Sequence, residues 1–208
     1  MISAGAAVAV GLVSLGLVVT PGPNMMYLVA RSLGQGLRAG MTSLAGVVAA
    51  FACYLGLTAA GLSVVFATVP ALYLVVKVLG AAYHAWLAWG VLRGRRSVLS
   101  SHDVAPDSPR RLMAMGFLTC ILNPKIALMY AALLPQFVDT ERGSTGQQIV
   151  LLGLVQIVVA TTVNAGWVLL AGRIRSTLQQ RPAAERATRY VVGLLLGGFA
   201  VHLAASTS

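Results

Sequence analysis

Thr20-Pro21-Gly22-Pro23-Asn24 interrupts a run of apolar residues that extends from about residue 5 to about residue 31. As one continuous helix, the run would be about 40 Å long at 1.5 Å per residue, whereas the apolar core of a bilayer is about 30 Å thick. Each proline removes an amide donor and clashes with the preceding turn, and Gly22 lets the backbone bend. Pro23 also suits the first turn of a new helix. The segment therefore predicts a membrane-spanning helix that is broken into two halves.

The predicted break leaves backbone groups without partners inside a membrane. The amides of Asn24, Met25 and Met26 would start the second half-helix, where no preceding carbonyl can accept them. Their partial positive charge favours a carboxylate, unless protein or water supplies the partner instead. For this motif alone, a kink whose free groups bond to neighbouring helices is the alternative.

A second motif of the same kind, Asn123-Pro124-Lys125, follows roughly 100 residues later in another apolar run. Asn123 could cap the new helix, and Lys125 adds a full positive charge beside its start. A lysine near the centre of a span costs about 2.5 to 3.5 kcal/mol on insertion scales, so its side chain should face the protein interior. The two motifs together predict one substrate-binding region, made of Pro21, Gly22, Pro23, Asn24, Asn123, Pro124 and Lys125.

The composition of the whole chain agrees with a membrane protein. Of its 208 residues, 58% are hydrophobic and 10% are charged, against about 25% charged in an ordinary soluble domain. Hydropathy predicts six transmembrane helices, near residues 5–31, 41–67, 70–92, 112–138, 147–171 and 188–205. We therefore expect an all-α integral membrane protein with a single transmembrane domain over residues 1–208. The first apolar segment should be a retained span and not a cleaved signal peptide.

The arginines predict how the chain lies in the membrane. Twelve of the 13 arginines fall in the first, third and fifth connections between the predicted helices, and the fourth connection holds only Arg142. Because basic residues collect on the cytoplasmic side, these three connections, including the basic connection 93–111, should be cytoplasmic. The protein would then be a multi-pass protein of the cytoplasmic membrane with both termini outside. This distribution also accounts for the net charge of +10 without a nucleic-acid partner.

The two breaks divide the chain into halves of similar design, residues 1–92 and residues 112–208. Each half has three predicted spans, an odd number, so the second half must enter the membrane with the opposite orientation. That is the arrangement of transporters built from inverted repeats, whose broken helices meet near the middle of the membrane. The expected fold is thus six helices in two inverted three-helix repeats, with the first and fourth helices broken.

Further polar side chains in the predicted spans could line a transport path: Tyr73, Lys77, His84, Gln156 and Asn164. The first three are spaced by four and seven residues and therefore share a helix face. Each residue has an ordinary alternative: a lysine can extend to the membrane surface, a histidine can be a packing residue, and amides can bond between helices. No Asp or Glu lies in a predicted span, so a substrate ammonium group would have to bind backbone carbonyls at the broken ends.

Two partners besides the lipid bilayer follow from these features. The proposed site calls for a small molecule with a carboxylate, an amino acid or a derivative, as substrate. The last predicted span contains Gly193 and Gly197, a pair of small residues that suits close helix packing. This packing could occur within the chain or across a homodimer.

Other residue patterns suggest weaker alternatives. Cys120 lies one turn before Pro124, which would suit a thiol-disulfide redox conduit, but Cys53 has no such setting and no paired cysteine motif occurs. Export of a divalent metal would require clusters of His, Asp or Glu in the spans, where only His84 and His202 are found. The sequence also has no nucleotide-binding glycine loop and no catalytic constellation, so we expect neither an enzyme nor a bound cofactor or metal.

The residues also resemble the lysine exporter family, which includes homoserine, threonine and other amino-acid efflux proteins. The resemblance covers at least residues 21–138 and is carried by Pro21-Gly22-Pro23-Asn24, Arg31, Gly34, Gly36, Arg38-Ala39-Gly40, Lys77, Gly80-Ala81-Ala82-Tyr83, Gly116-Phe117-Leu118-Thr119, Asn123-Pro124-Lys125 and Pro135-Gln136-Phe137. It implies a six-helix secondary exporter, driven by the membrane gradient, with substrate sites around the two broken helices. The carboxylate would bind near Asn24 and Lys125, and rocking of the halves would expose it outside.

The chain departs from the usual pattern of that family at three places. Many members carry Gly and then an acidic residue where this chain has Ala50 and Phe51. They carry Asn in place of Cys120 and an aliphatic residue in place of His84. These departures concern residues that the resemblance connects with proton coupling and with the choice of substrate.

Overall fold

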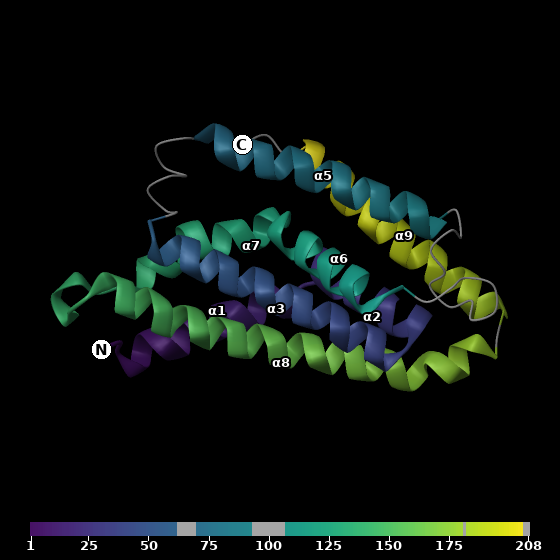
Figure 1. Ribbon diagram of the computed structural model, residues 1–208, viewed down its shortest axis with the longest axis horizontal. Coiled ribbons are helices and arrows are strands. Elements are labelled where there is room, and N and C mark those ends of the chain that lie inside the picture. Colours follow the sequence, from purple (N-terminus) through teal and green to yellow (C-terminus); the bar gives the residue numbers. More distant parts are fainter. Residues whose placement is uncertain (62–69, 93–106, 181, 206–208) are drawn as a thin grey trace.

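The computed structural model describes residues 1–61, 70–92, 107–180 and 182–205 (Figure 1). Every regular element in these ranges is a helix, in agreement with the predicted all-α class. The α-helices are α1 (Ala4–Val19), α2 (Pro23–Gln35), α3 (Leu37–Ala59), α5 (Pro70–Leu92), α6 (Pro109–Ile121), α7 (Pro124–Leu128), α8 (Thr145–Gln179) and α9 (Pro182–Ala205). The π-helix η1 (Met129–Leu133) and the 3-10 helix η2 (Leu134–Phe137) continue α7, and a second 3-10 helix, η3 (Thr140–Arg142), precedes α8.

The two predicted breaks are both present in the structure. α1 and α2 meet at a bend of 57°, and α6 meets the helical segment Pro124–Phe137 at a bend of 57° as well. In each pair the second helix begins with a proline, Pro23 in α2 and Pro124 in α7. A proline is tolerated at this position because its missing amide would have no partner in the helix.

Within the described ranges, three helices are long and apolar enough to cross a membrane: α3, the segment Leu74–Leu92 of α5 and the segment Thr145–Thr177 of α8. Counting each bent pair as one span raises the number to five, and α9 adds a shorter apolar helix, Tyr190–Ala205. The chain is therefore a multi-pass helical membrane protein. The predicted span 41–67 and the predicted basic connection 93–111 both extend into residues that lie outside the described part of the chain.

The largest difference from the predicted boundaries concerns α8, which has 35 residues and extends well past the predicted end at residue 171. At 1.5 Å per residue it is about 50 Å long, more than the bilayer core of about 30 Å. Arg173 and Arg175, which were expected in a connection, belong to α8. Arginine has a high helix propensity, and no proline interrupts the chain before Pro182, so the helix continues beyond its apolar segment.

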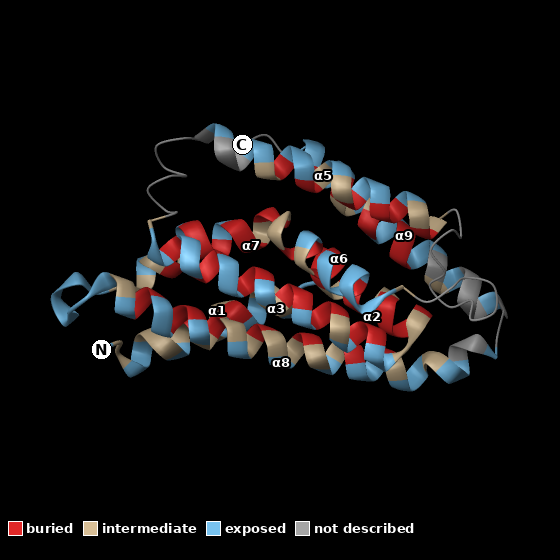
Figure 2. Cartoon of the chain, viewed as in Figure 1, coloured by how far each residue is buried: buried red, intermediate tan, exposed pale blue. Residues whose placement is uncertain are grey.

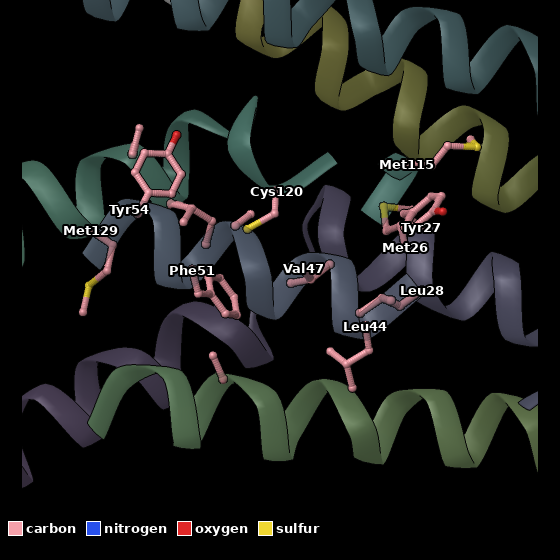
Figure 3. Packing of buried hydrophobic residues seen from close by; sticks show 14 of the residues in the cluster. Met26, Tyr27, Leu28, Leu44, Val47, Phe51, Tyr54, Met115, Cys120 and Met129 are labelled. Carbon is pink, nitrogen blue, oxygen red and sulfur yellow. The ribbon is translucent and has the colours of Figure 1, made fainter. Parts of the chain in front are cut away.

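α3 lies at the centre of a bundle with α1, α2, α6 and α8, and α5 and α9 pair with each other along one side (Figure 1). Buried residues lie on the helix faces that are turned toward one another (Figure 2). Figure 3 shows Leu44 and Phe51 of α3 pointing toward α8, and Tyr54 pointing toward α7. The outer surface is also apolar: Val158 and Leu194 are 64% and 65% exposed. Such a surface suits contact with lipid.

α3 and α6 approach each other closely at two glycines. A Cβ atom at Gly46 would lie 2.1 Å from the carbonyl oxygen of Met113, and a Cβ atom at Gly116 would lie 2.1 Å from that of Ser43. Small residues permit such close contact of helix backbones in membranes. Each glycine therefore lies where a side chain would separate the two helices.

The small-residue pair of α9 packs within the chain. A Cβ atom at Gly193 would lie 2.5 Å from Cδ2 of Leu92, and a Cβ atom at Gly197 would lie 3.8 Å from Cβ of Ala88. Both partners belong to α5, so the pair helps α5 and α9 to pack against each other. A role of the same pair in a homodimer stays a prediction.

Two arginines of the predicted connections, both in described helices, lie at the same end of the bundle. Arg175 of α8 donates hydrogen bonds to two carbonyl oxygens near the end of α2. Arg31 of α2 pairs with Asp107, which directly precedes α6. At the other end, the amino group of Met1 donates a hydrogen bond of 3.1 Å to the carbonyl oxygen of Arg142. The arginine-bearing ends of α2, α6 and α8 therefore lie together, away from the N-terminus.

Candidate functional site

The two helix breaks, more than 100 residues apart in sequence, meet in the structure. Lys125, the second residue of α7, reaches across to the end of α1 and donates hydrogen bonds from Nζ to the carbonyl oxygens of Leu17, at 2.5 Å, and Thr20, at 3.3 Å. A Cβ atom on Gly22 would lie 3.9 Å from the same Nζ atom. The structure thus brings together the two motifs that the sequence singled out.

Lys125 caps the broken end of α1. The last carbonyl groups of a helix have no partner within it and carry partial negative charge, so a cation is favourable there. Sequence reasoning assigned the charge of Lys125 to a carboxylate ligand, whereas the structure gives it two backbone acceptors first. An ammonium group has three N–H donors. One donor of Lys125 is therefore left for a ligand after the bonds to Leu17 and Thr20.

The start of α2 keeps two backbone amides without acceptors in the described part of the chain. Gly22 occupies the capping position and has no side chain to accept them, and Pro23 has no amide. The amide of Met26 donates to the carbonyl oxygen of Gly22 at 3.0 Å, so the expectation of a free amide is wrong for Met26. The amides of Asn24 and Met25 are the two that remain, and they carry the positive end of the helix dipole.

The start of α7 is different, because Asn123 satisfies it. Its side chain accepts the amide of Lys125 at 3.1 Å. Its carbonyl oxygen accepts the amides of Ile126, at 3.0 Å, and Ala127, at 3.1 Å. Asparagine is among the residues that cap helices best. The first break therefore offers a carboxylate the free backbone amides at the start of α2. The second break offers it the side chain of Lys125.

A pocket of about 320 Å³, including its open mouth, lies at the meeting point of the breaks. Its wall comprises residues of α1, α2, α3, α7 and α8 together with the two break segments: Leu17, Val18, Thr20, Gly22, Asn24, Met25, Phe51, Asn123, Lys125, Ile126 and Asn164. Lys125 is the one charged residue in this lining. Apolar walls with a few converging polar groups are typical of sites for small molecules.

Of the residues expected along a transport path, Asn164 lines this pocket. Gln156 accepts a hydrogen bond from the Tyr130 hydroxyl, which joins α8 to η1. His84 is fully buried, its Nδ1 atom lies 2.6 Å from the carbonyl oxygen of Gly80, and its ring packs edge-on against Phe199 of α9. The Tyr130–Gln156 and His84–Phe199 contacts each join two helical segments.

Lys77 and Tyr73 also belong to α5, and Lys77 is not among the residues of the pocket lining. Lys77 is 7% exposed, so its predicted extension to the membrane surface is not seen. The reason is its place on the buried face of α5, which it shares with Gly80 and His84. The side chain of Tyr73 lies outside the described part of the structure.

Two residues of the pocket wall, and one carboxylate outside the pocket lining, escaped sequence reasoning. Phe51 of α3 and Val18 of α1 form apolar walls of the pocket. Phe51 was recognised only as a departure from a family pattern, and nothing in its local sequence placed it beside the break. Asp107 lies in the predicted basic connection 93–111. The one feature of the sequence that could have drawn attention to it is a carboxylate among many arginines. Its partners became visible only in the fold.

The described part of the structure shows neither a cysteine pair for a thiol-redox conduit nor a ligand cluster for a metal exporter. Cys53 is exposed on α3 and Cys120 is buried on α6, and both are free thiols. No group of three or more His, Cys, Asp or Glu side chains that could hold a metal ion occurs among the residues that the structure describes.

A pocket between two broken helices, inside a bundle with an apolar outer surface, is typical of membrane transporters. The chain belongs to the LysE type translocator family, whose model matches residues 15–207.

Relatives of this chain cover nearly its whole length. It is 25% identical over 192 residues to a leucine efflux protein of Enterobacter sp. (strain 638), and the matched region covers 90% of each chain. It is 28% identical over 192 residues to a leucine efflux protein of Klebsiella pneumoniae, which spans 90% of this chain and 89% of the relative. A leucine efflux protein of Salmonella typhimurium is 26% identical over 194 residues, again with 90% and 89% coverage. No solved structure gives a significant match.

Proposed function

We propose that this protein is a secondary exporter of amino acids or closely related small metabolites in the cytoplasmic membrane. The observation that carries the proposal is the pocket where the two breaks meet, which combines the Lys125 ammonium group, two free backbone amides and apolar walls. The names of the relatives, leucine efflux proteins, support the same class of substrate.

The positive groups of the pocket suit the carboxylate of an amino acid. The free amides of Asn24 and Met25 belong to the start of α2, where a negative charge is favourable. The remaining N–H donor of Lys125 would add a charge-assisted hydrogen bond, which is stronger than one between neutral groups. Because these donors come from both breaks, a bound carboxylate would connect the two halves of the chain.

The rest of the pocket suits an apolar side chain. Leu17, Val18, Phe51 and Ile126 supply hydrophobic surface. Burying a charged or polar group against such a surface without a partner costs free energy. The pocket therefore favours a substrate with an aliphatic side chain over one whose side chain is charged.

We further infer that the chain forms six spans arranged as two inverted repeats, residues 1–92 and 112–208. Each half begins with a helix pair that is bent by 57° and whose second helix starts with a proline. The arginine-bearing end of the bundle would face the cytoplasm, which leaves both termini outside. Transport would consist of rocking one half against the other around the pocket, driven by a gradient across the membrane.

A counterflow assay with purified protein in liposomes tests this function. Vesicles loaded with unlabelled leucine should accumulate labelled leucine from outside, and protein-free vesicles should not. Val158→Ala is the matched control, because Val158 is 64% exposed on the outer surface of α8 and should not affect transport. The proposed function is wrong if no amino acid or related metabolite moves under any proton or potential gradient.

A further inference from the structure

Two buried asparagine oxygens beside the pocket have no hydrogen-bond partner. The described residues include four buried side-chain oxygens of this kind, on Ser14, Asn24, Thr161 and Asn164. Among these four residues, the two asparagines line the pocket. An unpaired buried acceptor costs free energy, so such atoms are rare in folded proteins unless a ligand or water completes them.

The orientation of Asn164 is set by its own helix. Its Nδ2 atom donates a hydrogen bond of 2.8 Å to the carbonyl oxygen of Ala160. A carbonyl oxygen can only accept, so the NH₂ group must lie on that side and Oδ1 is left without a donor. Asn164 is 2% exposed and Asn24 is 7% exposed, so bulk water does not reach these side chains freely.

The unpaired oxygens suit a ligand group that donates hydrogen bonds and accepts none. An ammonium group has three N–H donors and no acceptor, and its charge strengthens each hydrogen bond that it makes. The pocket lining contains no acidic residue that could take this role. Amide oxygens therefore supply the acceptors that a carboxylate would supply elsewhere.

We propose that Asn24 and Asn164 bind the α-ammonium group of the substrate. This inference rests on the proposed function and deepens it. Asn24 belongs to α2 and Asn164 to α8, two helices that pack against each other. A bound ammonium group would thus connect α2 to α8, while the carboxylate lies toward Lys125 and the start of α2.

The same arrangement defines a substrate class. The site takes a zwitterion with an unmodified amino group and a neutral, aliphatic side chain. A second positive charge on the side chain would have no acidic partner in the lining and would lie near Lys125, which repels it. A carboxylic acid without the amino group would leave both asparagine oxygens unpaired.

Binding of labelled leucine to the purified protein, measured by scintillation proximity, tests the proposal on the unmodified chain. The competitors are leucine, 4-methylpentanoate, which has the same carbon skeleton without the amino group, and lysine. Leucine should compete at a concentration roughly tenfold or more below that of either other compound. Equal potency of leucine and 4-methylpentanoate would overturn the proposal.

A pair of variants locates the effect. Asn164→Leu keeps the side-chain size and removes the oxygen, so leucine affinity should fall roughly tenfold while the affinity for 4-methylpentanoate changes less than about twofold. Thr161→Val is the control, because it removes an unpaired oxygen of the same helix outside the pocket lining, and it should leave both affinities unchanged.

The outcomes separate this inference from the proposed function. If Asn164→Leu lowers the affinities for leucine and 4-methylpentanoate equally, Asn164 is a structural residue and the inference is wrong. Continued transport of leucine would leave the proposed function intact. Should Asn164→Leu fail to yield monodisperse protein, the competition on the unmodified chain decides. If that chain neither binds nor transports any amino acid, the proposed function itself fails.

Discussion

The guanidinium group of Arg31 lies 2.5 Å from the carboxylate of Asp107 and connects α2 to the start of α6 across 76 residues of sequence. The two side chains are only 8% and 11% exposed. Gln35 donates to the same carboxylate oxygen at 2.9 Å, and Arg111 pairs with the other oxygen at 3.0 Å. Because a buried charge is costly without partners, these side chains stabilise the fold as a group.

Asp107→Ala should destabilise the protein strongly, because Arg31 would stay buried without its carboxylate. Loss of one partner from a buried pair costs about 3 to 5 kcal/mol. Thermal unfolding in detergent, followed by tryptophan fluorescence, measures the change. Asp139→Ala is the control, since its pair with Arg142 is about half exposed and exposed pairs contribute about 1 kcal/mol or less. Equal losses in the two variants would contradict the role given to Asp107.

Lys125→Ala should insert normally into the membrane and lose at least about tenfold in leucine counterflow, because one charge-assisted contact to the substrate is removed. The cap on α1 is lost at the same time, because the carbonyl oxygens of Leu17 and Thr20 lose the hydrogen bonds that Lys125 donates. Gln136→Ala serves as the comparison, because its exposed amide donates only to its own helix turn. Counterflow at the unmodified rate in Lys125→Ala would remove Lys125 from the site.

Gly46→Ala should destabilise the protein, because its Cβ atom would lie 2.1 Å from the backbone oxygen of Met113. Inserting an atom into such a contact typically costs about 1 to 3 kcal/mol. Gly56→Ala, in the same helix with no atom within 4 Å of its Cβ position, should be neutral or stabilising because alanine favours helix. Detergent thermal unfolding of the two variants side by side checks this, and a neutral Gly46→Ala would mean that α3 and α6 lie further apart.

Asn123→Ala should lower stability by about 0.5 to 2 kcal/mol, the usual cost of losing a helix cap. The amide of Lys125 would lose its 3.1 Å acceptor and join the unpaired groups at the break. Asn123→Ser should recover most of the loss, because serine also caps helices well. Thermal unfolding of both variants gives the measurement, and no difference between alanine and serine would show that the cap is unimportant.

The broad fold was open to prediction because its causes are local. Pro23 and Pro124 each interrupt an apolar run, and the structure has a 57° bend at each of these places. The end of α8 was misplaced, because hydropathy reports where apolar residues stop and Arg173 and Arg175 continue the helix into a polar region. Hydropathy and helix length are different properties, and only the first can be read from apolar runs.

The residues that line the pocket were predicted in part. The sequence identified Asn24, Asn123 and Lys125 as the groups at the breaks, and the structure places all three in the lining of one pocket. Asn164 was one of several polar residues in its span, and nothing local distinguished it from Gln156. The distinction depends on neighbours, because Gln156 bonds to Tyr130 whereas the oxygen of Asn164 has no partner.

By itself, the sequence determined that the chain is helical, lies in a membrane and breaks at two prolines, because hydropathy and proline stereochemistry act within a few residues. Tertiary structure alone decided where the freed groups find partners. Lys125 binds the carbonyl oxygens of Leu17 and Thr20, and Asn164 reaches the same pocket from α8. These contacts join residues far apart in the chain, so they exist only once the helices have packed.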